Sequence, residues 1–274
     1  MCIFTYSLDL FLDGSIRDKA VKSACRWVVQ NCTHLDKLKF NKLWKGLFYS
    51  TFSISMLQHC VSNETVLALW MADRPSYQSR LAQRLADIWL ELDEINEDAS
   101  HFYAHAFWST ICREWNGIDR FRLDKYYALV RAFLIAAFGI MRKNRWCPQV
   151  IDRIGLLWRE FVLNPNSCLE VPDALRIYAL ENFVALYKEA CLGFKLDEEQ
   201  CIKLLDPYIV LAAHTTKPSV FKAAKIFLES LAGLEDFLEL QAVGRKIFSA
   251  GESGEIRTTN RSILYATGQR LQRL

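Results

Sequence analysis

Glu97, His101 and His105 recur every four residues, which places one carboxylate and two imidazoles on a single face of a helix. These groups bind metal ions, and a helical metal site would use this spacing. The remaining ligands of such a site are not evident, and the His-Phe-Tyr-Ala-His run lacks the glutamate of the hydrolytic zinc motif. We interpret the three side chains as a solvated, hydrogen-bonded helix face and predict neither a metal site nor a cofactor.

The sequence offers no candidate for catalysis. It has no Gly-rich phosphate loop, no nucleophile elbow and no cysteine–histidine signature. Its nine cysteines never form Cys-x-x-Cys, and several fall at apolar helical positions, which is typical of reduced thiols rather than a disulfide framework. We therefore predict a protein that is not an enzyme and has no small-molecule substrate.

The densest mixture of charges lies in residues 113–125, where four basic and three acidic residues surround an Asn-Gly pair. Gly117 predicts a left-handed residue that ends one helix, Ile118 can fold back on that helix, and Asp119 can cap the next one. These roles do not explain the basic residues. The binding candidates in this segment are Arg113, Trp115, Asn116, Gly117, Asp119, Arg120, Arg122, Asp124 and Lys125.

Two interpretations of the basic residues are open and compatible. Arg120, Arg122 and Lys125 lie at a short corner between helices, where charges are easily exposed to a partner. Alternatively, Asp119 and Asp124 pair with them.

Three tryptophans stand beside basic residues: Trp44 beside Lys45, Trp115 close to Arg113, and Trp146 beside Arg145. Each tryptophan can pack in the core, contact a partner helix or stack on an RNA base, and core packing is the usual role of tryptophan in an amphipathic helix.

The segment 113–125 resembles the signature of the nucleolar ribosomal RNA processing protein 1 family. Three other segments agree with that family in the same order, at residues 17–22, 43–49 and 70–75 with Gln78. The resemblance implies a non-catalytic scaffold in large-subunit (pre-60S) ribosome biogenesis that supports processing of the precursor RNA in the nucleolus. A general helical-repeat adaptor and a repeat protein that reads RNA sequence are the alternatives.

The resemblance also implies one shared binding patch. Its partners would be other large-subunit assembly factors and, through phosphate contacts, precursor ribosomal RNA, with no membrane. Besides the residues of segment 113–125, the expected patch contains Trp44, Lys45, Gly46, Asp73, Arg74, Pro75 and Gln78.

The composition suits a packed helical protein. The chain has 274 residues, of which 51% are hydrophobic, and only 11 are Gly and 6 are Pro. The net charge of +3 excludes a globally basic nucleic-acid binder, but the charge is uneven. Residues 17–45 hold eight basic and two acidic residues, whereas residues 87–98 hold six acids and no base. Separate basic and acidic surfaces suit an assembly factor that contacts both RNA and protein, although solvated helix faces are also charged.

Apolar residues recur at helical spacing almost throughout, so we predict an all-α fold. Helix starts near residues 76, 124, 172 and 218, with partner helices near 98, 148, 197 and 234, give a period of 46 to 48 residues. This period favours a HEAT-like helical-repeat solenoid. A compact irregular bundle is the alternative.

We predict a single domain over residues 1–274, with a looser basic C-terminal end at 251–274. Compared with the family, residues 50–69 look inserted between the second and third matching segments. The longest uncharged apolar run, at about residues 132–141, is too short to span a bilayer.

Overall fold

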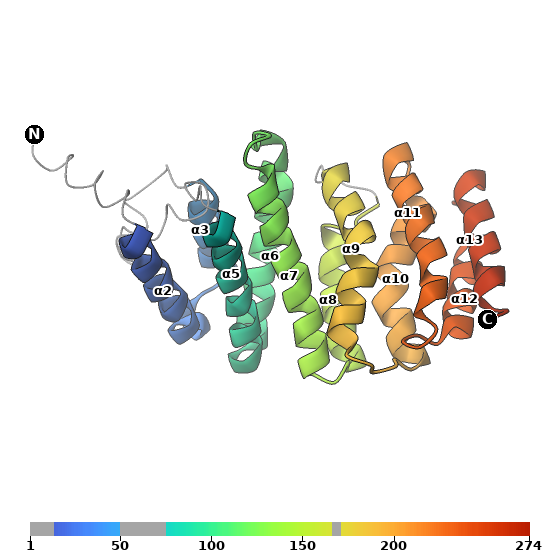
Figure 1. Ribbon diagram of the computed structural model, residues 1–274, viewed down its shortest axis with the longest axis horizontal. Helices are drawn as coiled ribbons and strands as arrows, with labels where there is room; N and C mark the ends of the chain where they lie inside the picture. Colours follow the sequence, from blue (N-terminus) through green and yellow to red (C-terminus); the bar gives the residue numbers. More distant parts are fainter. Residues whose placement is uncertain (1–13, 50–74, 166–170) are drawn as a thin grey trace, which may run out of the picture. The chain divides into compact units, whose positions relative to one another are not determined.

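The computed structural model describes residues 14–49, 75–165 and 171–274, and within these ranges it contains helices and no strand (Figure 1). The all-α prediction is therefore confirmed. The predicted insertion at residues 50–69 lies outside the described residues, as do Asp73 and Arg74. The chain divides into two compact units, residues 1–136 and 137–274, and the prediction of a single domain stays a prediction.

The first unit contains α2 (Gly14–Gln30), α3 (Lys37–Tyr49), α5 (Pro75–Ile95), α6 (Glu97–Glu114) and the first part of α7 (Leu123–Lys143). Helix α5 packs between α2 and α6, and α3 also packs on α6. A tight turn joins α5 to α6, since the side chain of Asn96 accepts a hydrogen bond of 2.8 Å from the Ala99 amide and caps α6. The two helices are therefore antiparallel neighbours.

An aromatic cluster forms the core of the first unit. The ring of Trp44 lies 5.2 Å from Tyr103, 5.1 Å from Phe107 and 5.4 Å from Phe133, measured between ring centroids. Phe107 and Phe133 stack at 3.6 Å. Such pairs contribute roughly 0.5 to 1.5 kcal/mol each beyond the burial of their area, so this cluster fixes α3, α6 and α7 together.

The second unit continues with α8 (Pro148–Glu160), α9 (Asp173–Cys191), α10 (Glu198–His214), α11 (Pro218–Ser230), α12 (Leu240–Ala250) and α13 (Thr258–Leu271). Helices α8, α10 and α12 pack in sequence as one layer, and α9, α11 and α13 as another (Figure 1). Each helix thus packs on the helix two places further along the chain, which is how helical repeats stack within a solenoid.

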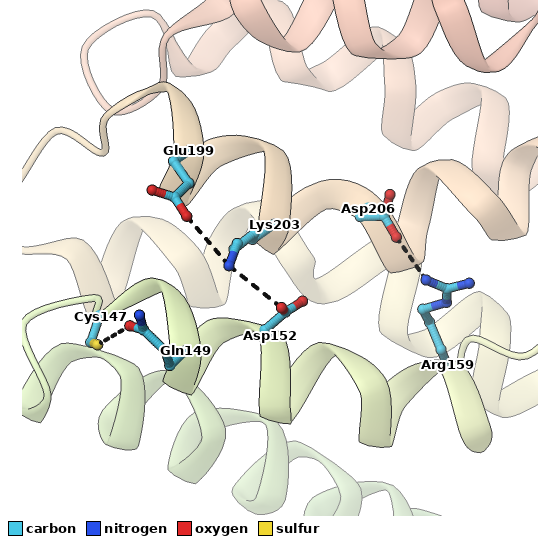
Figure 2. Close-up of polar contacts among 7 residues, drawn as sticks. All are labelled: Cys147, Gln149, Asp152, Arg159, Glu199, Lys203 and Asp206. Atoms are coloured by element: carbon cyan, nitrogen blue, oxygen red, sulfur yellow. Dashed lines mark hydrogen bonds and ion pairs between the residues drawn. The ribbon is translucent and has the colours of Figure 1, made fainter.

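Ion pairs join the helices of the first of these layers. Figure 2 shows Lys203 of α10 between Asp152 of α8 and Glu199 of its own helix, at 3.4 Å from each, and Arg159 of α8 at 3.1 Å from Asp206. Asp206 also receives Lys246 of α12 at 2.9 Å. Exposed ion pairs contribute only about 0 to 1 kcal/mol each to the stability of a fold. These pairs therefore help to align neighbouring helices more than they stabilise the protein.

Candidate interaction surface

The charged segment 113–125 forms the corner between α6 and α7. Helix α6 ends at Glu114, a 3-10 turn covers Trp115–Gly117, and α7 begins at Leu123. This is the green loop at the top of α6 and α7 in Figure 1. Ile118 is buried, and its amide donates a 3.1 Å hydrogen bond to the Trp115 carbonyl. Ile118 is therefore a core residue of the corner, and its packing on the last turn of α6 stays a prediction.

The prediction of a left-handed Gly117 is wrong. Gly117 is absent from the residues with positive φ, and a Cβ atom built on it would meet nothing within 4 Å. The chain leaves α6 through a 3-10 turn instead of a left-handed cap, so the turn does not need a glycine at this position.

The prediction that Asp119 caps α7 is also wrong, because α7 begins four residues later. The Asp119 carboxylate accepts a 3.0 Å hydrogen bond from the Phe121 amide and pairs with Arg122, while its carbonyl accepts the Arg122 amide at 3.0 Å. Although desolvation opposes ionisation, the bonds from Arg122 and Phe121 hold the pKa of Asp119 below its usual value. Asp119 therefore closes the turn before the helix, which confirms that part of the basic charge is paired.

Three of the predicted contact residues point into the protein. Trp44, Trp115 and Lys125 are only 3%, 5% and 4% exposed, so their side chains are not available to a partner. Trp115 packs edge-on against Tyr127 at 4.9 Å. Trp146, at 2% exposed, is likewise a core residue. Of the three roles considered for the tryptophans, the structure shows core packing, and the expectation that Lys125 is exposed is wrong.

Other predicted contact residues do lie on the surface. Lys45, Arg113, Asn116, Arg120 and Asp124 are exposed, and Gln78 is half-buried. Arg113 pairs with Glu114 at 2.6 Å, so its charge is partly compensated.

Phe121 was missed by the sequence analysis although it is the most conspicuous residue of the corner. Its side chain is 82% exposed, and the Arg120 guanidinium lies 4.7 Å from its ring centroid. Phenylalanine and arginine are both enriched at protein interfaces, so the pair is a candidate contact for a partner. The available signal was its position between two arginines in a turn, outside any helical pattern.

The topology brings three of the predicted segments to one end of the first unit. Ring contacts pair Phe40 with Tyr103 and Phe48 with Tyr126, so α3 runs parallel to α6 and ends beside the corner. Helix α5 is antiparallel to α6, so its start at Pro75 lies at the same end. Gly46 belongs to the last turn of α3. We call this end, with its exposed residues Lys45, Arg113, Asn116, Arg120 and Phe121, the corner surface.

Two helices of the corner surface also share an electrostatic contact. Partial burial raises the pKa of Glu114 at the end of α6, and the positive charge of Lys45 on α3 opposes that rise. The lysine and the corner therefore belong to one surface.

The series on α6 is only in part the solvated face that the sequence suggested, since Glu97 is exposed and His101 half-buried but His105 is buried. His105 is only 7% exposed, and its ring lies 6.0 Å from that of His101. Among the residues that the structure describes, no three His, Cys, Asp or Glu side chains form a group that could hold a metal ion. In the same part of the chain, the apolar stretches of the helices fall short of what a membrane crossing requires.

Comparison with known proteins agrees with the resemblance found in the sequence. The family described as "Nucleolar protein, Nop52" matches residues 12–58 and 67–262. The unmatched residues 59–66 fall within the stretch that the sequence analysis predicts to be inserted.

Named relatives carry the same signal. The chain is 31% identical over 208 residues to "Ribosomal RNA processing protein 1 homolog B" of Homo sapiens, covering 74% of this chain and 24% of the relative. It is 29% identical over 206 residues to human homolog A, covering 73% of this chain and 39% of the relative. The homolog of Caenorhabditis elegans is 24% identical over 201 residues, covering 73% of this chain and 44% of the relative. The chain thus spans less than half the length of these relatives. Since the family match covers most of its residues, the chain belongs to the Nop52 family of nucleolar proteins.

Proposed function

We propose that this chain is a non-catalytic scaffold in the assembly of the large ribosomal subunit, and that it supports processing of the precursor RNA without cleaving it. The family is nucleolar, and the relatives are named for ribosomal RNA processing.

The exposed Arg120 and Phe121 pair is the observation that carries this proposal. An aromatic ring and a guanidinium in contact at a helix corner are residue types that dominate protein interfaces. Asp119 closes the turn that presents the pair, because its carboxylate accepts the Phe121 amide. A partner assembly factor would need an apolar pocket for Phe121 with acidic groups at its rim for Arg120 and Lys45.

Two buried cysteines are poor candidates for catalytic nucleophiles. Burial raises the pKa of Cys191 to about 11 and that of Cys201 to about 12. Neither thiol ionises near neutral pH, so neither is a ready nucleophile.

Sedimentation of the tagged protein through a sucrose gradient tests the proposal. A scaffold is expected in pre-60S fractions, together with precursor RNA of the large subunit. A protein found only in the free pool at the top of the gradient would instead favour the general adaptor. Treating the extract with ribonuclease before the gradient is the control, because it should release a protein held in particles.

A further inference from the structure

A basic cleft of about 530 Å³ opens between α2 and α5 in the first unit. Lys22 and Arg26 line it from α2, and Arg80 and Arg84 line it from α5, joined by Tyr77 and Asp87. Each basic pair is spaced four residues apart, so both side chains of a pair lie on one helix face. Four cations therefore face one another across the two helices, with one acid among them.

Much of this charge is not compensated. Arg84 pairs with Glu91 at 2.7 Å, and the Asp87 carboxylate accepts a 2.8 Å hydrogen bond from Gln83. Lys22, Arg26 and Arg80 are exposed and have no acidic partner among the described residues. The contrast with the second unit is direct, because there Arg159, Lys203 and Lys246 are matched by acids on neighbouring helices.

We propose that this cleft binds the phosphates of single-stranded RNA. Arginine forks match phosphate oxygens, and a groove that combines cations with an aromatic ring is typical of proteins that hold single strands. Tyr77, half-buried at the start of α5, contributes an aromatic side chain to the lining of the cleft. Such binding would follow the backbone and would be independent of RNA sequence.

An acidic peptide fits the cleft less well. A peptide that docks between helices needs apolar anchor pockets. The aliphatic side chain that lines this cleft, Leu81, is only 3% exposed and is already packed in the core. Recognition therefore rests mainly on the charge of the four basic residues. That the phosphates belong to RNA rests on the proposed function, whereas the corner surface and this cleft are separate sites with separate tests.

The experiment measures fluorescence anisotropy of a fluorescein-labelled oligouridylate with the purified chain over a range of KCl concentrations. The test variant is Lys22→Gln/Arg26→Gln/Arg80→Gln. The matched control is Lys222→Gln/Arg270→Gln/Arg273→Gln, which removes the same charges from exposed positions of the second unit. Circular dichroism checks that both variants fold.

The test variant should bind about tenfold or more weakly at physiological salt. The negative slope of its log K against log salt should become shallower by about 2, since each of the three lost phosphate contacts contributes about 0.7. The control should keep the wild-type slope. If the triple variant unfolds, the single Lys22→Gln and Arg80→Gln variants should each make this slope shallower by about 0.7.

Three results would overturn the proposal: no binding of the oligouridylate by the wild-type chain, equal loss in test and control variants, or equally tight binding of labelled polyglutamate through the same residues. Because no ribosomal particle is present, the outcome does not depend on where the chain sediments in a gradient.

Discussion

Helices α12 and α13 cross at two glycines, and this crossing allows a quantitative prediction. A Cβ atom built on Gly268 would lie 2.8 Å from both the Cβ and the backbone nitrogen of Phe248, and 2.9 Å from the carbonyl oxygen of Gly244. Two of these neighbours are backbone atoms, so they cannot move aside without moving α12. Gly268→Ala should therefore force the two helices apart.

The expected cost follows from two opposing effects. Carbon atoms pack best at about 3.5 to 4.0 Å, so relieving the clash requires a shift of roughly 0.7 Å or more. Overpacking of this kind costs about 1 to 3 kcal/mol, and rigid backbone neighbours place Gly268 at the upper end. Alanine regains about 1 kcal/mol of helix propensity. We expect Gly268→Ala to lower the free energy of unfolding by about 2 kcal/mol, or the melting temperature by about 5 °C.

Urea unfolding followed by circular dichroism measures this change, with Gly117→Ala as the control. The same substitution at Gly117 meets no atom within 4 Å and should leave stability almost unchanged. A Gly268→Ala variant as stable as the wild type would show that α12 and α13 do not approach as closely as the structure has them.

Three further predictions concern stability. Asn260→Leu should lower the free energy of unfolding in urea by about 2 kcal/mol. The buried Asn260 amide donates hydrogen bonds of 2.9 to 3.2 Å to three carbonyls at the end of α10, and those carbonyls would lose their partner. Because the pKa values of Cys191 and Cys201 are raised to about 11 and about 12, the two thiols stabilise the fold fully below the unfolded-chain thiol pKa of 9.0, and this stabilisation is lost as pH rises towards 11 and 12. The Cys191→Ala/Cys201→Ala variant should therefore lose less stability than the wild type between about pH 8 and about pH 10, measured by unfolding. Gly117→Val should cost less than about 1 kcal/mol in a thermal melt, because Gly117 has no positive φ, and a larger loss would contradict the 3-10 turn seen here.

Most helix starts could be predicted because their signals are local. Proline at or before a first turn and the box formed by Asp197 and Gln200 act through neighbouring backbone groups, and the box is present in the structure. The predicted starts near 76, 98, 124, 148, 172, 197 and 218 agree within two residues with the observed first residues Pro75, Glu97, Leu123, Pro148, Asp173, Glu198 and Pro218.

The start predicted near residue 234 was wrong, because α12 begins at Leu240. The carbonyl of Phe237 accepts hydrogen bonds from the Leu196 amide and the Tyr187 hydroxyl, each at 3.0 Å. These partners are about 40 and 50 residues away in the chain, so a local apolar pattern could not reveal that they hold residues 235–239 out of a helix.

The candidate surface was harder to predict than the fold. Composition identified segment 113–125, but it could not tell exposed Arg120 from buried Lys125, since both are basic residues near a helix start. Their environments depend on how α7 is rotated against α3 and α6. Phe121 was overlooked for the complementary reason, because hydrophobic residues are expected in the core and its exposure depends on the turn that Asp119 closes.

The most direct test of the central claim is the sedimentation of an Arg120→Ala/Phe121→Ala variant through a sucrose gradient. Both side chains are exposed, so the variant should melt within a few degrees of the wild type. If the corner surface docks the chain onto assembling large subunits, the folded variant should move from pre-60S fractions to the free pool, while Lys222→Ala/Arg270→Ala stays in the particles. A folded Arg120→Ala/Phe121→Ala protein that enters pre-60S particles at the wild-type level would contradict the claim.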